Sequence, residues 1–292
     1  MIKTQPYDKY SARVGEACAW IHSFGINYSQ TRLGRYQRLW KRLGREVERG
    51  DVSPFFTEVP APEFYNLVHE SNELIAIHEG LSQQGGAALE DRLRKSLDGH
   101  ELCVLEGKSH KGRDFAFELF VASLFARTGI TVDFSQEADL EIPHAGQLVL
   151  VECKRLRSVA KVEARIKEGL DQLERRYATK DPLTGPLGLL ALSISTLENP
   201  ALGKIVASSP RRASRIILSR IESFINEHRK WWFRDSDARH LGVLVILNCP
   251  CEISGEPLFL TAMQMGLGNT VRSGTPEFSF LWEIFAILNH EV

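Results

Sequence analysis

Between residues 115 and 155, three of the acidic residues and the lysine have the types and the spacing of groups that act on phosphate esters. Glu118 lies in a run with helical spacing, Asp139 precedes a short apolar segment, and Glu152 and Lys154 end an apolar run. Carboxylate oxygens are hard ligands that favour Mg²⁺ or Mn²⁺. A lysine beside them can neutralise charge on a phosphate. This combination predicts a metal-dependent site for phosphodiester hydrolysis.

Glu118 belongs to a helix that the spacing of apolar residues predicts over residues 114–128. Plotted at 100° per residue, Glu118 lies on the same face as Phe115, Val121 and Phe125. A carboxylate on an apolar face is costly to bury unless it is paired or binds a cation. The alternative is a glutamate that reaches solvent or an arginine at the end of the helix, so Glu118 alone does not establish a site.

Residues 147–154 are predicted to form a mostly apolar strand. The alternation of a strand places Glu152 and Lys154 on one face and Cys153 on the other. Both charges then lie at the carboxyl end of the strand, where ligand sites of α/β sheets gather. A surface ion pair at the end of a strand explains an isolated Glu-x-Lys pattern equally well.

Asp139 lies one hairpin-sized interval before this strand. Antiparallel pairing of 138–142 with 147–154 would bring Asp139 beside Glu152. Two adjacent carboxylates raise each other's pKa unless a cation lies between them. Glu141 shares the strand face of Asp139 and is therefore a reserve ligand.

The order and spacing of these groups resemble the PD-(D/E)xK nuclease superfamily. The matching residues are Glu118 on the helix, Asp139 in the hairpin, and Glu152, Cys153 and Lys154 on the strand. The resemblance covers residues 114–155, and Ala138 replaces the expected proline. It implies a restriction-endonuclease-like α/β core, with a central mixed sheet flanked by helices.

The resemblance also implies a role for each group. Asp139, Glu152 and the backbone carbonyl of Cys153 would bind one Mg²⁺ or Mn²⁺ ion. Glu118 would reach the same ion directly or through a water molecule. The metal would polarise the phosphate and help ionise the attacking water, and Lys154 would orient that water and neutralise charge on phosphorus. In-line attack of water is expected to leave 5′-phosphate and 3′-hydroxyl ends.

A long amphipathic helix predicted over residues 158–178 adds a basic flank. Such a flank suits a phosphate backbone, but a solvated face with ion pairs one turn apart fits equally well. The resemblance gives Gln172 an active-site role in this helix. The candidate nucleic-acid contacts are Lys161, Arg165 and Arg176 in this helix, and Lys111 and Arg113 before Glu118.

Composition limits the class of protein without identifying a function. The chain has 292 residues, 43% of them hydrophobic, and a formal net charge of −1, so any basic surface must come from local clustering. Its five scattered cysteines do not have the spacing of a zinc site, and reduced thiols are expected. The sequence has no leader-like segment and no apolar run of membrane-spanning length, which predicts a cytoplasmic protein.

The predicted secondary structure changes near residue 105, from helices alone to alternating helices and strands. Residues 1–105 are predicted to be a helical N-terminal region for substrate or partner recognition, with an arginine-rich helix from Arg32 to Arg49. Residues 106–292 alternate helices and apolar strands and are predicted to form the nuclease domain. The predicted strands are 131–135, 138–142, 147–154, 187–195 and 241–247, a helix is predicted over 210–230, and residues 258–292 remain unassigned.

These features predict a metal-dependent nuclease that acts on DNA rather than RNA. A role in restriction or anti-phage defence follows only from family analogy. Two alternatives stand beside this prediction: a nucleic-acid-binding or assembly subunit that keeps the nuclease fold as a scaffold, and a nuclease directed at RNA. A protein partner or a homodimer is compatible with each of them, and a role at a membrane is not expected.

Overall fold

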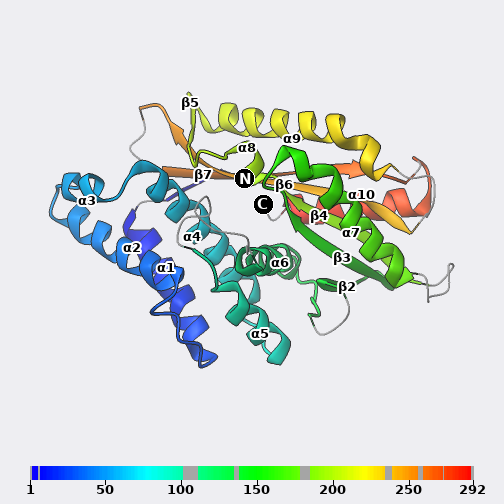
Figure 1. Cartoon of the computed structure of the whole chain (residues 1–292), viewed down its shortest axis with the longest axis horizontal. Helices are drawn as coiled ribbons and strands as arrows, with labels where there is room; N and C mark the ends of the chain where they lie inside the picture. Colours follow the sequence, from blue (N-terminus) through cyan, green and yellow to red (C-terminus); the bar gives the residue numbers. More distant parts are fainter. Residues whose placement is uncertain are drawn as a thin grey trace.

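The computed structural model describes most of the chain. The described residues are 2–5, 7–100, 111–134, 138–177, 185–233, 239–255, 259–271 and 273–290. Within them a helical N-terminal region is followed by a mixed β-sheet with helices on both faces (Figure 1). The predicted α/β class is therefore confirmed.

Helices dominate the first part of the chain. They are α1 (Tyr7–Ser23), α2 (Arg32–Glu48), α3 (Ser53–Glu58), α4 (Ala61–Leu81), α5 (Ala87–Ser96) and α6 (Lys111–Ala126). Helices α4 and α6 pack closely because Gly80 lies against the backbone of Ser123. A Cβ atom on Gly80 would lie 2.5 Å from the carbonyl oxygen of Ser123. The glycine thus allows the long helix α4 to hold α6 in place.

The sheet has the strand order β1-β7-β6-β4-β3-β2, and β5 also pairs with β6. Its strands are β1 (Ile2–Gln5), β2 (Leu140–His144), β3 (Gln147–Arg155), β4 (Leu187–Ser193), β5 (Ile205–Ala207), β6 (His240–Ile253) and β7 (Phe259–Asn269). The central strands β3, β4 and β6 are parallel, whereas β2 and β7 run antiparallel to their neighbours. Helices cover both faces, which explains the continuous apolar runs of the central strands.

The two faces of the sheet contribute to two hydrophobic cores. One face packs against α4, α6 and the last helix, α10 (Pro276–His290). The other packs against α7 (Val162–Tyr177) and α9 (Pro210–Trp232). A short turn of 3₁₀ helix, Val159–Lys161, leads into α7, and α8 (Ser195–Glu198) follows β4.

The alternation of side chains along β3 determines which face of the sheet each charged residue of the strand points to. Val151 and Cys153 belong to the core on the α4 and α6 side, whereas Leu150 belongs to the core on the α7 and α9 side. The strand alternation then places Glu152 and Lys154 on the α7 side. Both sequence predictions about this strand, its extent and its facing, agree with the structure.

Three details of the sequence prediction need correction. Of the predicted strand 131–135 the structure describes residues 131–134, and these form a single antiparallel bridge between Asp133 and Glu141, whose N–H groups each donate to the other's carbonyl at 2.9 Å. Asp139 precedes β2 rather than lying within it. The unassigned C-terminal segment contains β7 and α10. The bridge joins Asp133 to the free edge of β2.

The predicted boundary near residue 105 lies outside the described residues, but the two parts are joined by packing. Trp40 and Phe64 from the helical region share one core with Phe117 and Val149. Strand β1 also pairs with β7 from the C-terminal part. None of the helices described here has the length and apolar character needed to cross a membrane.

Candidate active site

A tight hairpin positions Asp139. The turn residues Ala145 and Gly146 both have positive φ, 48° and 78°, as two-residue hairpin turns with the right twist require. The register pairs Leu140 with Val151, and one further step places Asp139 opposite Glu152. The Asp139 carboxylate accepts a hydrogen bond from the backbone N–H of Cys153 through Oδ2, at 2.8 Å.

This hydrogen bond also orients the backbone carbonyl of Cys153. A residue in a strand directs its N–H and C=O to the same side, so the Cys153 carbonyl points toward Asp139. The resemblance predicted that these two oxygen groups would bind one ion. Their shared direction agrees with that prediction, although it does not test it.

Glu152 is fully buried and its two oxygens pair with two cations. Lys154 Nζ donates to Oε2 at 3.2 Å, and Arg176 Nη1 from α7 donates to Oε1. A buried carboxylate requires such partners, because leaving one charge of the group unpaired costs several kcal/mol. Arg176 therefore faces the candidate site instead of forming part of an open basic surface.

Helix α7 lies close to β3 because residue 169 is a glycine. A Cβ atom on Gly169 would lie 2.5 Å from Leu190 Cδ1 and 3.5 Å from Lys154 Cγ. Gln172 lies one turn further along α7, on the helix face between Gly169 and Arg176. Its Oε1 is buried and makes no hydrogen bond to any described residue. The helix geometry thus brings Gln172 toward the Glu152–Lys154 pair.

Glu118 reaches the same region from α6. Its pKa is raised to about 8, first by burial and then by the negative charge of Asp139, while Arg92 and Lys154 act in the opposite direction. Glu118 is 8% exposed and pairs with Arg92, whose Nε lies 3.1 Å from Oε2. The sequence left open whether Glu118 binds a cation of a site or pairs with an arginine, and here its partner is Arg92.

Arg92 is the residue of this cluster that sequence reasoning missed. Besides Glu118 it contacts two backbone carbonyls, Phe134 O at 2.7 Å and Asp139 O at 3.0 Å. It also lies over the ring of Phe134. Arg92 belongs to the short helix α5, 26 residues before Glu118, and no spacing rule connects the two. It ties α5 to the segment that carries Asp139.

The donor types in this cluster fit Mg²⁺ or Mn²⁺, but their present spacing does not form a closed ligand set. Within the described ranges, no three His, Cys, Asp or Glu side chains lie close enough to hold a metal ion. The ion pairs account for this, because Arg92 occupies Glu118 while Lys154 and Arg176 occupy Glu152. Binding of an ion would require at least one arginine to withdraw.

The predicted nucleic-acid contacts divide into surface and interior residues. Lys111 and Lys161 are exposed, and Arg165 is half-buried and pairs with Glu168 at 2.8 Å. Arg113 is only 2% exposed and pairs with a glutamate of α4, so it cannot contribute to an exposed basic surface. The solvated-face alternative for α7 is thus realised in part.

The groups chosen from the sequence gather around Cys153. Burial raises the pKa of its thiol, and the charges of Asp139 and Glu118 raise it further, while Lys154 and Arg92 lower it. Four charged groups from α5, α6, the hairpin and β3 therefore lie near one point of the sheet. Comparison with protein-family models, curated proteins and solved structures found no match to this chain.

Proposed function

We propose that this protein is a metal-dependent nuclease with an active site of the PD-(D/E)xK type. The observation that carries the proposal is the hydrogen bond from Cys153 N–H to the Asp139 carboxylate, within the Glu152-Cys153-Lys154 strand. It brings the hairpin acid against the strand motif in the register that the resemblance requires. The raised pKa of Glu118 beside Asp139 supports the same arrangement, because a divalent ion would relieve the repulsion.

The side chains of the cluster would divide the chemistry. A bound Mg²⁺ or Mn²⁺ would polarise the phosphate and lower the pKa of a water molecule. Asp139, Glu152 and the Cys153 carbonyl would hold the ion, with Glu118 directly or through water. Lys154, held against Glu152, would orient the attacking water and neutralise charge on the phosphate.

Helix α7 would supply the parts that change during the reaction. Arg176 pairs with Glu152 here, and in the presence of an ion it would contact a phosphate instead. Gln172 carries a buried Oε1 that makes no hydrogen bond within the described chain, and it would accept one from the attacking water or from Lys154.

Nucleic acid, and DNA in preference to RNA, is the proposed substrate. Lys111 and Lys161 are exposed and Arg165 is half-buried, at the starts of the two helices, α6 and α7, that carry Glu118 and Arg176. A second basic area is an open groove between α1 and α2, which Arg38 and Lys41 line. Most other arginines of α2 pair within the helical region, so the groove depends on a small number of charges. Restriction or anti-phage defence remains the proposed biological role, by analogy with the superfamily.

A second candidate function is a nucleic-acid-binding or assembly subunit that uses this fold as a scaffold. One observation favours it: Glu118 and Glu152 already have cationic partners within the chain itself. A site that needs no metal for charge balance would be stable without catalysis. The two candidates therefore differ in whether a divalent ion displaces these ion pairs.

The test is cleavage of supercoiled, linear and single-stranded DNA and of RNA by the purified protein, with Mg²⁺, Mn²⁺ or EDTA. We expect metal-dependent cutting that falls by about 10²-fold or more in Asp139→Ala and Lys154→Ala. The matched control is Lys167→Ala, because Lys167 is an exposed lysine of α7 whose partner is Glu163. This variant should cut as the parent does.

Each other outcome points to a different function. Cutting that is unaffected by both substitutions would refute the proposed site. No cutting, together with DNA binding that is equal in EDTA and Mg²⁺ and unchanged in Asp139→Ala, would favour the scaffold function. Faster cutting of RNA than of DNA would move the proposal to the RNA-directed alternative. Phage plating on cells that carry the parent or Lys154→Ala would test the defence role.

A further inference from the structure

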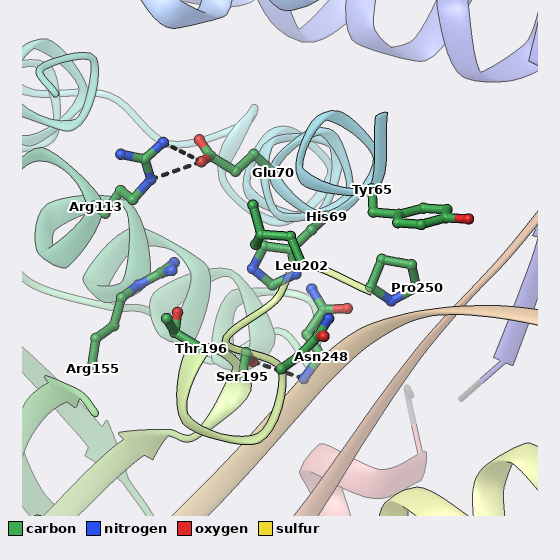
Figure 2. A pocket seen from close by; sticks show the side chains of 11 residues that line it. Tyr65, His69, Glu70, Arg113, Arg155, Ser195, Thr196, Leu202, Asn248 and Pro250 are labelled. Carbon is green, nitrogen blue, oxygen red and sulfur yellow. Dashed lines mark hydrogen bonds and ion pairs between the residues drawn. The ribbon is translucent and has the colours of Figure 1, made fainter. Parts of the chain in front are cut away.

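A polar pocket lies on the other face of β3, where β3 and β4 end beside β6 (Figure 2). Side chains from α4, α6, α8, strands β3 and β6, and the segment that follows α8 surround it. The edge formed by the carboxyl ends of parallel strands is where α/β proteins bind ligands. The pocket is partly open to solvent.

Arg155 supplies the first unsatisfied donor of this pocket. It follows Lys154 in the chain and points to the opposite face, toward α4 and α6. Its Nη2 pairs with Glu73, and its guanidinium lies 5.4 Å from the centre of the Phe117 ring. The residue is 5% exposed, yet its Nε makes no hydrogen bond to any residue that the structure describes.

Asn248 supplies an unsatisfied acceptor in the same pocket. Its backbone N–H donates to Ser195 Oγ at 2.9 Å, which fixes this part of β6 against α8. The side chain is 4% exposed, and within the described chain its Oδ1 has no hydrogen-bond donor. A buried polar atom without a partner costs about 1–3 kcal/mol. Two such atoms in one pocket point to a ligand that satisfies both.

The charges around the pocket favour an anion. Among the described lining residues the one carboxylate is Glu70, and it is already held between Arg32 and Arg113. Burial would raise the pKa of Glu70, but these two arginines outweigh it and lower the pKa to about 2. Burial also lowers the pKa of His69, which is neutral near pH 7. The remaining polar groups of the lining are donors, hydroxyls and amides.

We propose that this pocket binds a phosphate group that carries a proton. A phosphate oxygen would accept the hydrogen bond from Arg155 Nε, and a P–OH group would donate to Asn248 Oδ1. Monohydrogen phosphate offers both kinds of group, whereas sulfate at neutral pH has acceptors only. The pair of unsatisfied atoms thus selects phosphate over sulfate. The inference does not depend on the nuclease proposal, because Arg155 and Lys154 face opposite sides of the sheet.

The experiment is isothermal titration of the full chain with inorganic phosphate and with sulfate, at neutral pH in EDTA. We expect phosphate to bind about tenfold or more tightly than sulfate, as one hydrogen bond to a charged ligand provides. Asn248→Leu should lose this preference while keeping its fold, because it replaces an unsatisfied buried atom with an apolar group of similar shape. Asn226→Leu, at an exposed position of α9, is the control and should bind as the parent does.

Competition distinguishes the sources of the phosphate group. If adenosine monophosphate displaces inorganic phosphate, the pocket accepts the phosphate of a nucleotide, and if it does not, the ligand is the free ion. Both results support the site. Lys154→Ala should bind phosphate as the parent does, whatever the cleavage assay gives. The proposal is overturned if phosphate does not bind, if sulfate binds equally well, or if Asn248→Leu keeps the preference.

Discussion

The two faces of strand β3 carry charged clusters that are organised in opposite ways. On the α7 side, Glu152 is enclosed by Lys154 and Arg176, so the cations of the chain saturate the carboxylate. On the α4 side, Arg155 has a carboxylate partner in Glu73 but keeps a buried N–H without one. The first cluster must open to accept a ligand, whereas the second offers unsatisfied atoms at once.

The difference arises from the helices that deliver the partners. Helix α7 places Arg176 against Glu152, and α5 places Arg92 against Glu118. Glu118 lies on α6, on the other face of the sheet, but it interacts electrostatically with Lys154 and Asp139 and is therefore counted with the Glu152 cluster. Helix α4 supplies carboxylates, Glu70 and Glu73, to arginines that come from α2, α6 and β3. In the first cluster, a metal ion would have to replace the arginines that now pair with the acids. In the second cluster, the acids pair with arginines and hold them in position.

Removing an acid from the cluster of Arg32, Arg113 and Arg155 should have the largest effect on stability. Glu70 is 9% exposed and bridges Arg32 and Arg113, at 2.8 Å and 2.6 Å. Glu70→Gln would leave buried guanidinium groups without their counter-charge, and we expect a loss of about 3–5 kcal/mol in the free energy of unfolding. Urea denaturation at neutral pH measures it.

The control for this prediction is an exposed ion pair of the helical region. Glu90 pairs with Arg94 at 2.8 Å on the surface of α5. Glu90→Gln should cost at most about 0.5 kcal/mol. Equal effects of the two substitutions would show that the α4 carboxylates do not brace the pocket, and the contrast between the two clusters would fail.

The pH dependence of stability should have opposite signs in the two clusters. The pKa of Glu118 in the folded state is about 8, above its ordinary 4.5, so its contribution is full below pH 4.5 and is lost as pH rises toward 8. The pKa of Glu70 is about 2, so its contribution is full above pH 4.5 and is lost as pH falls toward 2. Through these two groups, the free energy of unfolding should therefore decline as pH rises above 4.5 and as it falls below 4.5.

Glu118→Gln tests the part of this stability profile that lies above pH 4.5. In EDTA, the variant should lose much of the decline between pH 4.5 and 8, which for one proton is at most about 1.4 kcal/mol per pH unit. Its acid limb should match that of the parent. Thermal or urea unfolding over this pH range provides the measurement, and an unchanged alkaline slope in Glu118→Gln would contradict the raised pKa.

A glycine substitution should disturb the α7 cluster and leave the pocket intact. Gly169→Ala places a methyl group against Leu190 and beside Lys154. We expect a loss of about 1–3 kcal/mol in stability and a slower cleavage reaction, with phosphate binding unchanged. Gly15→Ala in α1 is the control, since its methyl group would meet no atom within 4 Å, and it should stabilise the helix by about 0.5–1 kcal/mol. A parent-like cleavage rate in Gly169→Ala would separate α7 from the site.

The smallest effect is expected at the rim of the α7 cluster. Arg165 is half-buried and shares its charge with Glu168. Arg165→Ala should weaken DNA binding by a few fold. It should also reduce the slope of log K against log salt concentration by about 1, because one phosphate contact is lost. Fluorescence anisotropy at several salt concentrations measures both quantities. If the salt dependence is unchanged, this flank does not touch the phosphate backbone.

Sequence reasoning predicted the elements that depend on local pattern. Apolar residues with a period of about 3.6 predicted the helix around Glu118 and helix α7, and the alternation of a strand predicted β3 with Glu152 and Lys154 on one face. The structure contains all three elements. The hairpin also followed, because residues 145 and 146 adopt a two-residue turn that fixes the register.

The long-range partners were beyond the reach of such patterns. Arg92 binds Glu118 across 26 residues, and Arg155 binds Glu73 across 82. Arg113 was predicted to contact nucleic acid because it lies shortly before Glu118 in the sequence, but it is buried and pairs with Glu70 of α4. Alternation does place Arg155 opposite Lys154, so its facing was within reach of the sequence, although its partners were not.

If the proposed active site is correct, the acids around Cys153 bind one divalent ion once an arginine withdraws. Titration of the metal-free protein with Mn²⁺, followed by electron paramagnetic resonance, measures this binding without any assumption about the substrate. We expect one bound ion in the parent, and markedly weaker binding in Asp139→Asn, which keeps the shape of the side chain and removes its charge. If the parent binds no Mn²⁺, or if Asp139→Asn binds it equally well, the proposed metal site is wrong.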